Sequence, residues 1–75
     1  MNYYDDAQYS VENFIKRKNL LFDDPDGSIL DEMVHRFYKN YYSYEMDEEY
    51  ALLAAISEVL ERKGMEVEEF EKWVP

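Results

Sequence analysis

Residues 28–44 read SILDEMVHRFYKNYYSY, and the rest of the chain is arranged around this stretch. It begins with Ser28, a residue type that favours the start of a helix, and Asp31 completes a weak capping box. Apolar and aromatic residues then recur at intervals of three and four, which predicts a helix with one buried face and Tyr42 on an exposed flank. The residues of this stripe are Leu30, Met33, Val34, Phe37, Tyr38, Tyr41 and Tyr44. No Pro or Gly follows, so an end near Ser43 and a bend into the next helix both stay open.

Upstream of this stretch, the sequence predicts a short helix from about Ser10 to Lys18. Ser10 is a favourable N-cap, and Tyr9 and Phe14 stand at the two positions of a hydrophobic staple. Three basic residues fall in the last turn, where positive charge favours the helix dipole. Residues 2–8 could extend this helix or fray, and the sequence does not decide between the two.

The connection at residues 23–27, DDPDG, has the composition of a tight turn. Asp24, Pro25 and Gly27 stand at the first, second and fourth positions of a β-turn, where these residue types are favoured. Asp and Gly also occur in calcium-binding loops. If Gly27 were the sixth position of an EF-hand loop, the first position would be Phe22 and the twelfth Met33. Neither side chain has a carboxylate, so the sequence excludes an EF-hand here.

Downstream, residues 50–63, YALLAAISEVLERK, predict the strongest helix of the chain, with Asp47 as its cap and Gly64 as its end. Its apolar side consists of Leu52, Leu53, Ile56, Val59 and Leu60. A last short helix is expected from about Glu66 to Val74. Its apolar face would consist of Val67, Phe70, Trp73 and Val74.

These segments predict an all-α fold, a small bundle of three main helices plus a short C-terminal helix, in one domain spanning residues 1–75. A chain of 75 residues buries only about 60% of the surface that its unfolded form exposes, so we expect marginal stability. The chain has no cysteine and one histidine, which excludes a disulfide framework and a His/Cys metal cluster. We expect no metal and no cofactor.

Candidates for catalysis are few. The one histidine, His35, lies next to Arg36 and off the apolar stripe, so a structural role is favoured over a catalytic one. Paired carboxylates acting as acid and base need a cleft that separates their pKa values, and three short helices offer little room for one. We therefore expect the protein not to be an enzyme.

The charge is strongly negative and unevenly placed. The net charge is −10, and residues 45–75 contribute −7 of it, from ten acids and three bases. Such a surface repels nucleic acid and anionic membranes and favours basic partners. The N-terminus has no signal-peptide pattern, and no apolar run reaches about eighteen residues. We expect a cytoplasmic protein.

The outline of three helices with a tight turn at Gly64 also fits a helix-turn-helix protein. The segment after that turn reads EVEEFEKW, however, and would bring four glutamates to the DNA phosphates, which argues against a recognition helix. Acids on successive helical turns, such as Glu58 with Glu61 or Glu45 with Glu49, would instead repeat every 5–6 Å or so, as a row of negative charges.

In size, excess of acid, tyrosine content and helical pattern, the chain resembles the small acidic DNA-mimic proteins of phages and mobile elements. These proteins inhibit host DNA-binding proteins such as uracil-DNA glycosylase, restriction enzymes and the bacterial sliding clamp. The resemblance is at the level of class and involves no residue motif. It implies an inhibitor whose acidic residues occupy the DNA-binding surface of a host replication, repair or restriction factor. The candidate acidic residues are Glu45, Asp47, Glu48, Glu49, Glu58, Glu61, Glu66, Glu68, Glu69 and Glu71.

The alternative is a small adaptor, antitoxin or regulatory subunit that binds a protein through an aromatic helix face. The candidate contacts are Tyr38, Tyr42 and Trp73, because Tyr and Trp combine a large apolar ring with a polar group and are enriched at interfaces. The same residues, with the small core, predict a homodimer.

Overall fold

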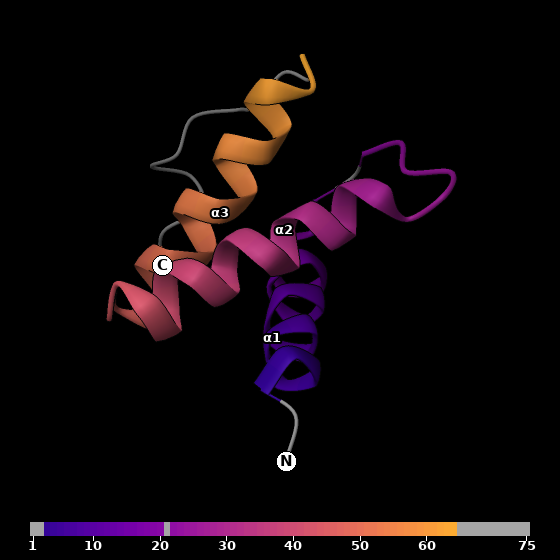
Figure 1. Ribbon diagram of the computed structural model, residues 1–75. Coiled ribbons are helices and arrows are strands. Elements are labelled where there is room, and N and C mark those ends of the chain that lie inside the picture. Colours follow the sequence, from indigo (N-terminus) through magenta and orange to yellow (C-terminus); the bar gives the residue numbers. More distant parts are fainter. Residues whose placement is uncertain (1–2, 21, 65–75) are drawn as a thin grey trace.

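The computed structural model describes residues 3–20 and 22–64, and within these ranges every regular element is helical. The elements are α1 (Tyr3–Lys18), α2 (Ser28–Tyr38), the π-helical turn η1 (Lys39–Ser43) and α3 (Glu48–Arg62). Helix α2 crosses α1 steeply, and α3 packs against α2 on the other side (Figure 1). The all-α class and the three main helices are confirmed. The C-terminal helix expected over residues 66–74 lies outside the described residues.

Helix α1 is longer than predicted, because it begins at Tyr3 rather than near Ser10. Ser10 therefore lies inside the helix and caps nothing, and the staple is absent because Tyr9 is 69% exposed. The cause is a buried stripe that starts upstream of the predicted cap and continues at helical spacing. Its fully buried members are Ala7, Val11 and Phe14.

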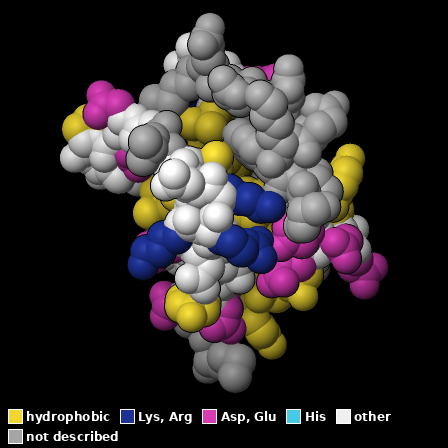
Figure 2. All heavy atoms as spheres, turned by 180° about the vertical axis from the view of Figure 1, so that it is seen from behind, with side chains coloured by type: hydrophobic (Ala, Val, Ile, Leu, Met, Phe, Trp, Pro, Cys, Tyr) yellow, Lys and Arg dark blue, Asp and Glu magenta, His cyan; other side chains and the backbone are white. Residues whose placement is uncertain are grey.

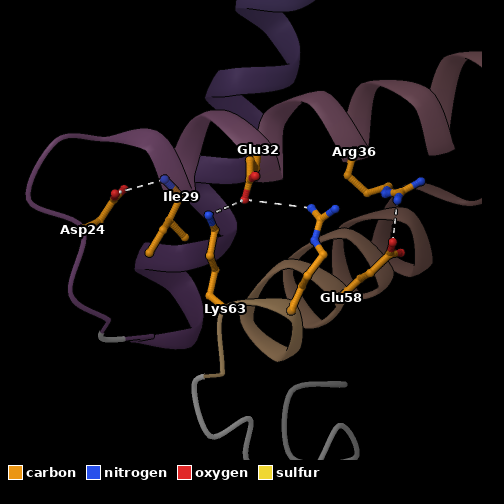
Figure 3. Close-up of polar contacts among 7 residues, drawn as sticks. Asp24, Ile29, Glu32, Arg36, Glu58 and Lys63 are labelled. Atoms are coloured by element: carbon orange, nitrogen blue, oxygen red, sulfur yellow. Dashed lines mark hydrogen bonds and ion pairs between the residues drawn. The ribbon is translucent and has the colours of Figure 1, made fainter.

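The start of α2 is held by Asp24. Its Oδ1 accepts the backbone N–H of Ile29 at 3.0 Å (Figure 3). Its Oδ2 accepts that of Leu30, also at 3.0 Å. These are two of the amide groups that a helix start leaves without a partner. The predicted turn brings Asp24 there and is confirmed: Gly27 donates its N–H to the Asp24 carbonyl at 3.4 Å and has φ 78°, a conformation that glycine adopts without strain.

The predicted capping box of Ser28 and Asp31 is wrong. Ser28 is the first helical residue, and its own N–H donates to Oδ1 of Asp26 at 3.1 Å. Asp31 instead accepts the hydroxyl of Tyr4 on α1 through its Oδ1, at 2.7 Å. The turn is compact enough to bring Asp24 and Asp26 back over the helix start, so these two carboxylates replace the local cap.

The core lies where α2 meets α1 and α3. The predicted stripe is confirmed as far as Tyr41. In α2, Met33, Val34 and Phe37 are buried and Leu30 and Tyr38 are partly buried against them, and Tyr41 of η1 is partly buried as well. The five apolar residues predicted for α3 are buried as well. Three small residues of α3 are buried too: Ala51, Ala55 and Ser57.

The π-helical turn Lys39–Ser43 ends the central helix. Asn40 is only 6% exposed; its Nδ2 donates to the carbonyl of Ala51 at 3.4 Å, and its own carbonyl accepts the N–H of Met46 at 3.1 Å. A π turn holds an extra residue and shifts the following side chains off the helical stripe. The predicted burial of Tyr44 is therefore wrong, and this side chain is 60% exposed.

Ion pairs show that α2 and α3 run in opposite directions. Near the start of α2, Oε2 of Glu32 lies 3.4 Å from Nζ of Lys63 and 3.9 Å from Nη2 of Arg62, at the end of α3 (Figure 3). One turn further along α2, Arg36 pairs with Glu58, one turn earlier in α3.

The predicted limits of the third helix are confirmed. Asp47 occupies the N-cap position, although its side chain makes no capping hydrogen bond. Helix α3 ends at Arg62, and Gly64 follows with φ 75°. At this φ, a residue with a Cβ is strained.

Candidate functional site

The connection between η1 and α3 carries three exposed carboxylates, those of Glu45, Asp47 and Glu48, which we call the acidic corner. Glu45 has φ 54°, so the backbone turns sharply at this residue. Asp47 is extended, with ψ 141°, and Glu48 opens α3. Among residues 3–20 and 22–64, none of the three forms an ion pair. The positive end of the α3 dipole favours the negative charge of Glu48, in the first turn of that helix.

Two of the predicted acidic residues are already neutralised within the fold. Glu49 accepts a hydrogen bond from Nη2 of Arg17 at 2.6 Å, which joins α3 to α1. Glu58 pairs with Arg36 of α2. These carboxylates would have to give up an internal partner before binding an external cation.

The expected rows of acids along the helices are only partly present. Glu45 lies before α3, so Glu45 and Glu49 do not stand on successive turns of one helix, and that prediction is wrong. Glu58 and Glu61 do share α3, but Glu58 is paired with Arg36 while Glu61 is exposed. The remaining predicted residues lie outside the described part of the chain; these are Glu66, Glu68, Glu69, Glu71 and Trp73.

A cluster of four tyrosine rings lies directly before the acidic corner. The ring centroid of Tyr42 is 5.3 Å from that of Tyr3, 5.0 Å from that of Tyr38 and 4.9 Å from that of Tyr41. Tyr3 is 55% and Tyr42 38% exposed, whereas Tyr38 and Tyr41 are half-buried. We call these four residues the tyrosine patch. It contains the two predicted contacts Tyr38 and Tyr42.

Tyr3 was missed from the sequence because the helix was expected to begin later. The signal was available: Tyr3 precedes Ala7 by one helical turn, and Ala7 continues the apolar stripe of α1. Contact between Tyr3 and Tyr42 requires α1 to cross η1, and no local pattern carries that information.

Two phenols have raised pKa values, that of Tyr42 in the patch and that of Tyr4 on α1. Partial burial raises the pKa of Tyr42, and the nearby carboxylate of Asp6 raises it further. The hydrogen bond to Asp31, helped by burial and by the charge of that carboxylate, raises the pKa of Tyr4 to about 12. Tyr42 and Tyr4 are therefore neutral at physiological pH.

Lys and Arg side chains gather on one face of the described chain. Figure 2, which views the molecule from behind, shows Lys and Arg side chains close together near the middle of that face, with acidic side chains around them. The last turn of α1 supplies three of the basic residues, Lys16, Arg17 and Lys18. Arg17 and Lys18 lie 5.5 and 5.9 Å from the centroid of the Phe14 ring.

A groove of about 650 Å³ separates this basic turn from the start of α3. Lys16 and Arg17 line one side and Glu48 and Glu49 the other, so its charges are mixed. The groove therefore favours neither an anion nor a cation, and we assign no ligand to it.

His35 is exposed and packs edge-on against Tyr4, with ring centroids 5.2 Å apart. Within the described ranges, no group of three His, Cys, Asp or Glu side chains could hold a metal ion. The arrangement is suited to binding cationic groups, through carboxylates at the acidic corner and through rings at the tyrosine patch.

Comparisons with protein-family models, with curated proteins and with solved structures found no match to this chain. None of the helices in residues 3–20 and 22–64 is long and apolar enough to cross a membrane.

Proposed function

We propose that this chain is a non-enzymatic cytoplasmic protein that binds the basic, nucleic-acid-binding surface of a partner protein, as a DNA mimic does. The acidic corner is the observation that supports the proposal. Its three carboxylates are exposed and have no ion-pair partner among the described residues, so they are available to Lys and Arg side chains of a partner.

Within the proposed surface of ten acids, we give the acidic corner the largest contribution. Glu49 and Glu58 have internal partners, so they contribute less to an external interaction than Glu45, Asp47 and Glu48. Glu61 is exposed near the other end of α3 and could make a separate contact. The acids of residues 66–71 stay in the proposal on the basis of sequence alone.

Pull-down of partners by the full chain from bacterial lysate, at low and high salt, tests this function. We expect the captured proteins to be nucleic-acid-binding proteins and the capture to weaken steeply with salt, since steering by exposed charges is screened. The variant Glu45→Gln/Glu48→Gln should lower capture by roughly tenfold, which corresponds to two lost contacts of about 0.7 kcal/mol each.

The matched control is Asp5→Asn/Asp23→Asn, which removes the same charge from exposed positions outside the corner. We expect it to change capture by less than about twofold. Partners that do not bind nucleic acid, and that are held equally well in high salt, would contradict the proposal.

The second candidate function is an adaptor, antitoxin or regulatory subunit that binds through an aromatic face. The exposure of Tyr3 and Tyr42 supports it, because large exposed rings are typical of interface anchors. In that case Tyr42→Ala would abolish capture while Glu45→Gln/Glu48→Gln would leave it unchanged.

Within this second candidate function, the tyrosine patch is also the candidate for a homodimer contact, as an alternative to binding a partner protein. A dimer would double the net charge and place two acidic corners at a fixed separation. Sedimentation velocity over a range of concentrations tests this, and a monomer at the highest concentration would refute it.

A further inference from the structure

We infer that the tyrosine patch binds a cationic side chain, an arginine or a lysine of the partner protein, against the exposed rings of Tyr3 and Tyr42, with Asp6 as its counter-ion. This inference rests on the proposed function, and it adds a second contact of different chemistry to the acidic corner.

The rings are held in place before any partner arrives. Tyr42 touches three other tyrosines, and its ring is tilted by 45° to Tyr3, by 42° to Tyr38 and by 79° to Tyr41. The buried Asn40 ties the π turn that carries Tyr41 and Tyr42 to α3. A binding surface ordered in advance loses little conformational entropy on binding.

The charge around the patch favours a cation over an apolar group. Asp6 follows Tyr3 by three residues in the first turn of α1, so both side chains lie on one face of that helix, and the Tyr3 ring contacts Tyr42. After partial burial, the carboxylate of Asp6 is the next cause of the raised pKa of the Tyr42 phenol. An apolar anchor placed here would desolvate that carboxylate without pairing it, which costs free energy. A cation would gain both the carboxylate and the negative face of the ring, an attraction of about 0.5–2 kcal/mol.

No cation of residues 3–20 or 22–64 lies over a ring of the patch. Within residues 3–20 and 22–64, the cation–ring contacts are those of Arg17 and Lys18 with Phe14, on another part of α1. Arg36 is paired with Glu58.

Half of the patch, Tyr41 and Tyr42, lies just before the acidic corner in the sequence. Tyr42 belongs to η1, which leads directly into Glu45 and Asp47. A nucleic-acid-binding surface presents several Arg and Lys side chains together, because these residues hold phosphates. One of them could pair with the corner while the next stacks on a ring, as guanidinium groups do on aromatic faces.

The test uses the full chain with isotope-labelled tyrosine rings and, as probe, a short peptide of alternating Arg and Gly. We expect the ring resonances of Tyr3 and Tyr42 to shift on titration. Tyr42→Phe keeps the ring face and should keep the affinity within about twofold, whereas Tyr42→Leu should lose about fivefold. Tyr3→Leu, at the first turn of α1, provides a second variant that leaves the core intact.

The outcomes separate this inference from the proposed function. Unchanged affinity in both leucine variants, or an equal loss in Tyr42→Phe and Tyr42→Leu, overturns the ring contact and leaves the acidic corner standing. Ring shifts that persist while Glu45→Gln/Glu48→Gln binds as tightly as the parent chain overturn the corner and leave the ring contact standing. No binding of the peptide to the parent chain overturns both.

Discussion

Asp24 is the residue that determines where α2 begins. Its two carboxylate oxygens accept two helix-start amides, while the neighbouring Ser28 is part of the helix and caps nothing. Asp24→Ala should therefore lower the free energy of unfolding by about 1–2 kcal/mol, the usual cost of a lost N-cap.

Urea unfolding followed by circular dichroism measures this loss. Ser28→Ala is the matched control, and we expect it to cost less than about 0.5 kcal/mol, because Ser28 is exposed. A larger loss for Ser28→Ala than for Asp24→Ala would show that the assignment of the cap is wrong.

The hydrogen bond between Tyr4 and Asp31 predicts a pH dependence. The pKa of Tyr4 is raised from 10.0 to about 12 in the folded chain. A raised pKa favours the protonated phenol in the folded state, so its contribution to stability is fully present below pH 10 and is lost as the pH rises toward 12.

Spectrophotometric titration of the tyrosines checks this dependence. Tyr4 gives the part of the phenolate absorbance change that occurs at the highest pH. With Asp31→Asn, this part should move to lower pH. Tyr4→Phe should remove the same part altogether. A titration curve that Asp31→Asn leaves unchanged would contradict the role of Asp31.

The pairing of α2 with α3 rests on the core more than on its ion pairs. Arg36 and Glu58 are both partly exposed, so water screens their attraction, whereas Ile56 of α3 is fully buried in the core. We expect Arg36→Gln to cost at most about 1 kcal/mol and Ile56→Ala to cost about 2–5 kcal/mol.

Urea unfolding of both variants at one temperature measures how much each substitution lowers the free energy of unfolding. Glu58→Gln serves as the control for Arg36→Gln, since each removes the same pair. Equal losses for Arg36→Gln and Ile56→Ala would show that the ion pairs contribute more than the packing.

The whole molecule carries a net charge of −10 on 75 residues, so its folded form is under electrostatic strain. Added salt screens this repulsion over distances of about 10 Å at 0.1 M. It also weakens the internal ion pairs, but those are partly exposed and few among the described residues. We expect the melting temperature to rise by a few degrees between low and high NaCl concentrations.

Thermal unfolding in a series of NaCl concentrations tests the effect of charge. The variant Glu45→Gln/Glu48→Gln, with a net charge of −8 (−10 plus 2), should have a higher melting temperature at low salt and a weaker dependence on salt. A melting temperature that falls with salt would mean that the ion pairs outweigh the repulsion.

Features that depend on residues close together in the chain were predicted from the sequence. The all-α class, the stripe of α2, the turn before Gly27 and the limits of α3 follow from apolar spacing and from turn residues, which act over one or two helical turns. The start of α1 and the cap of α2 were not predicted, because a weak apolar residue, Ala7, extends one helix and a folded-back loop caps the other.

The sequence by itself determined how much charge the chain carries and where its helices lie. Only the tertiary structure decided which acids remain available and which rings meet. Arg17 neutralises Glu49 across a helix interface, and the crossing of α1 brings Tyr3 onto Tyr42. Those contacts join residues far apart in the chain, so they depend on how the helices pack, and the periodicity of each segment specifies only which face it buries.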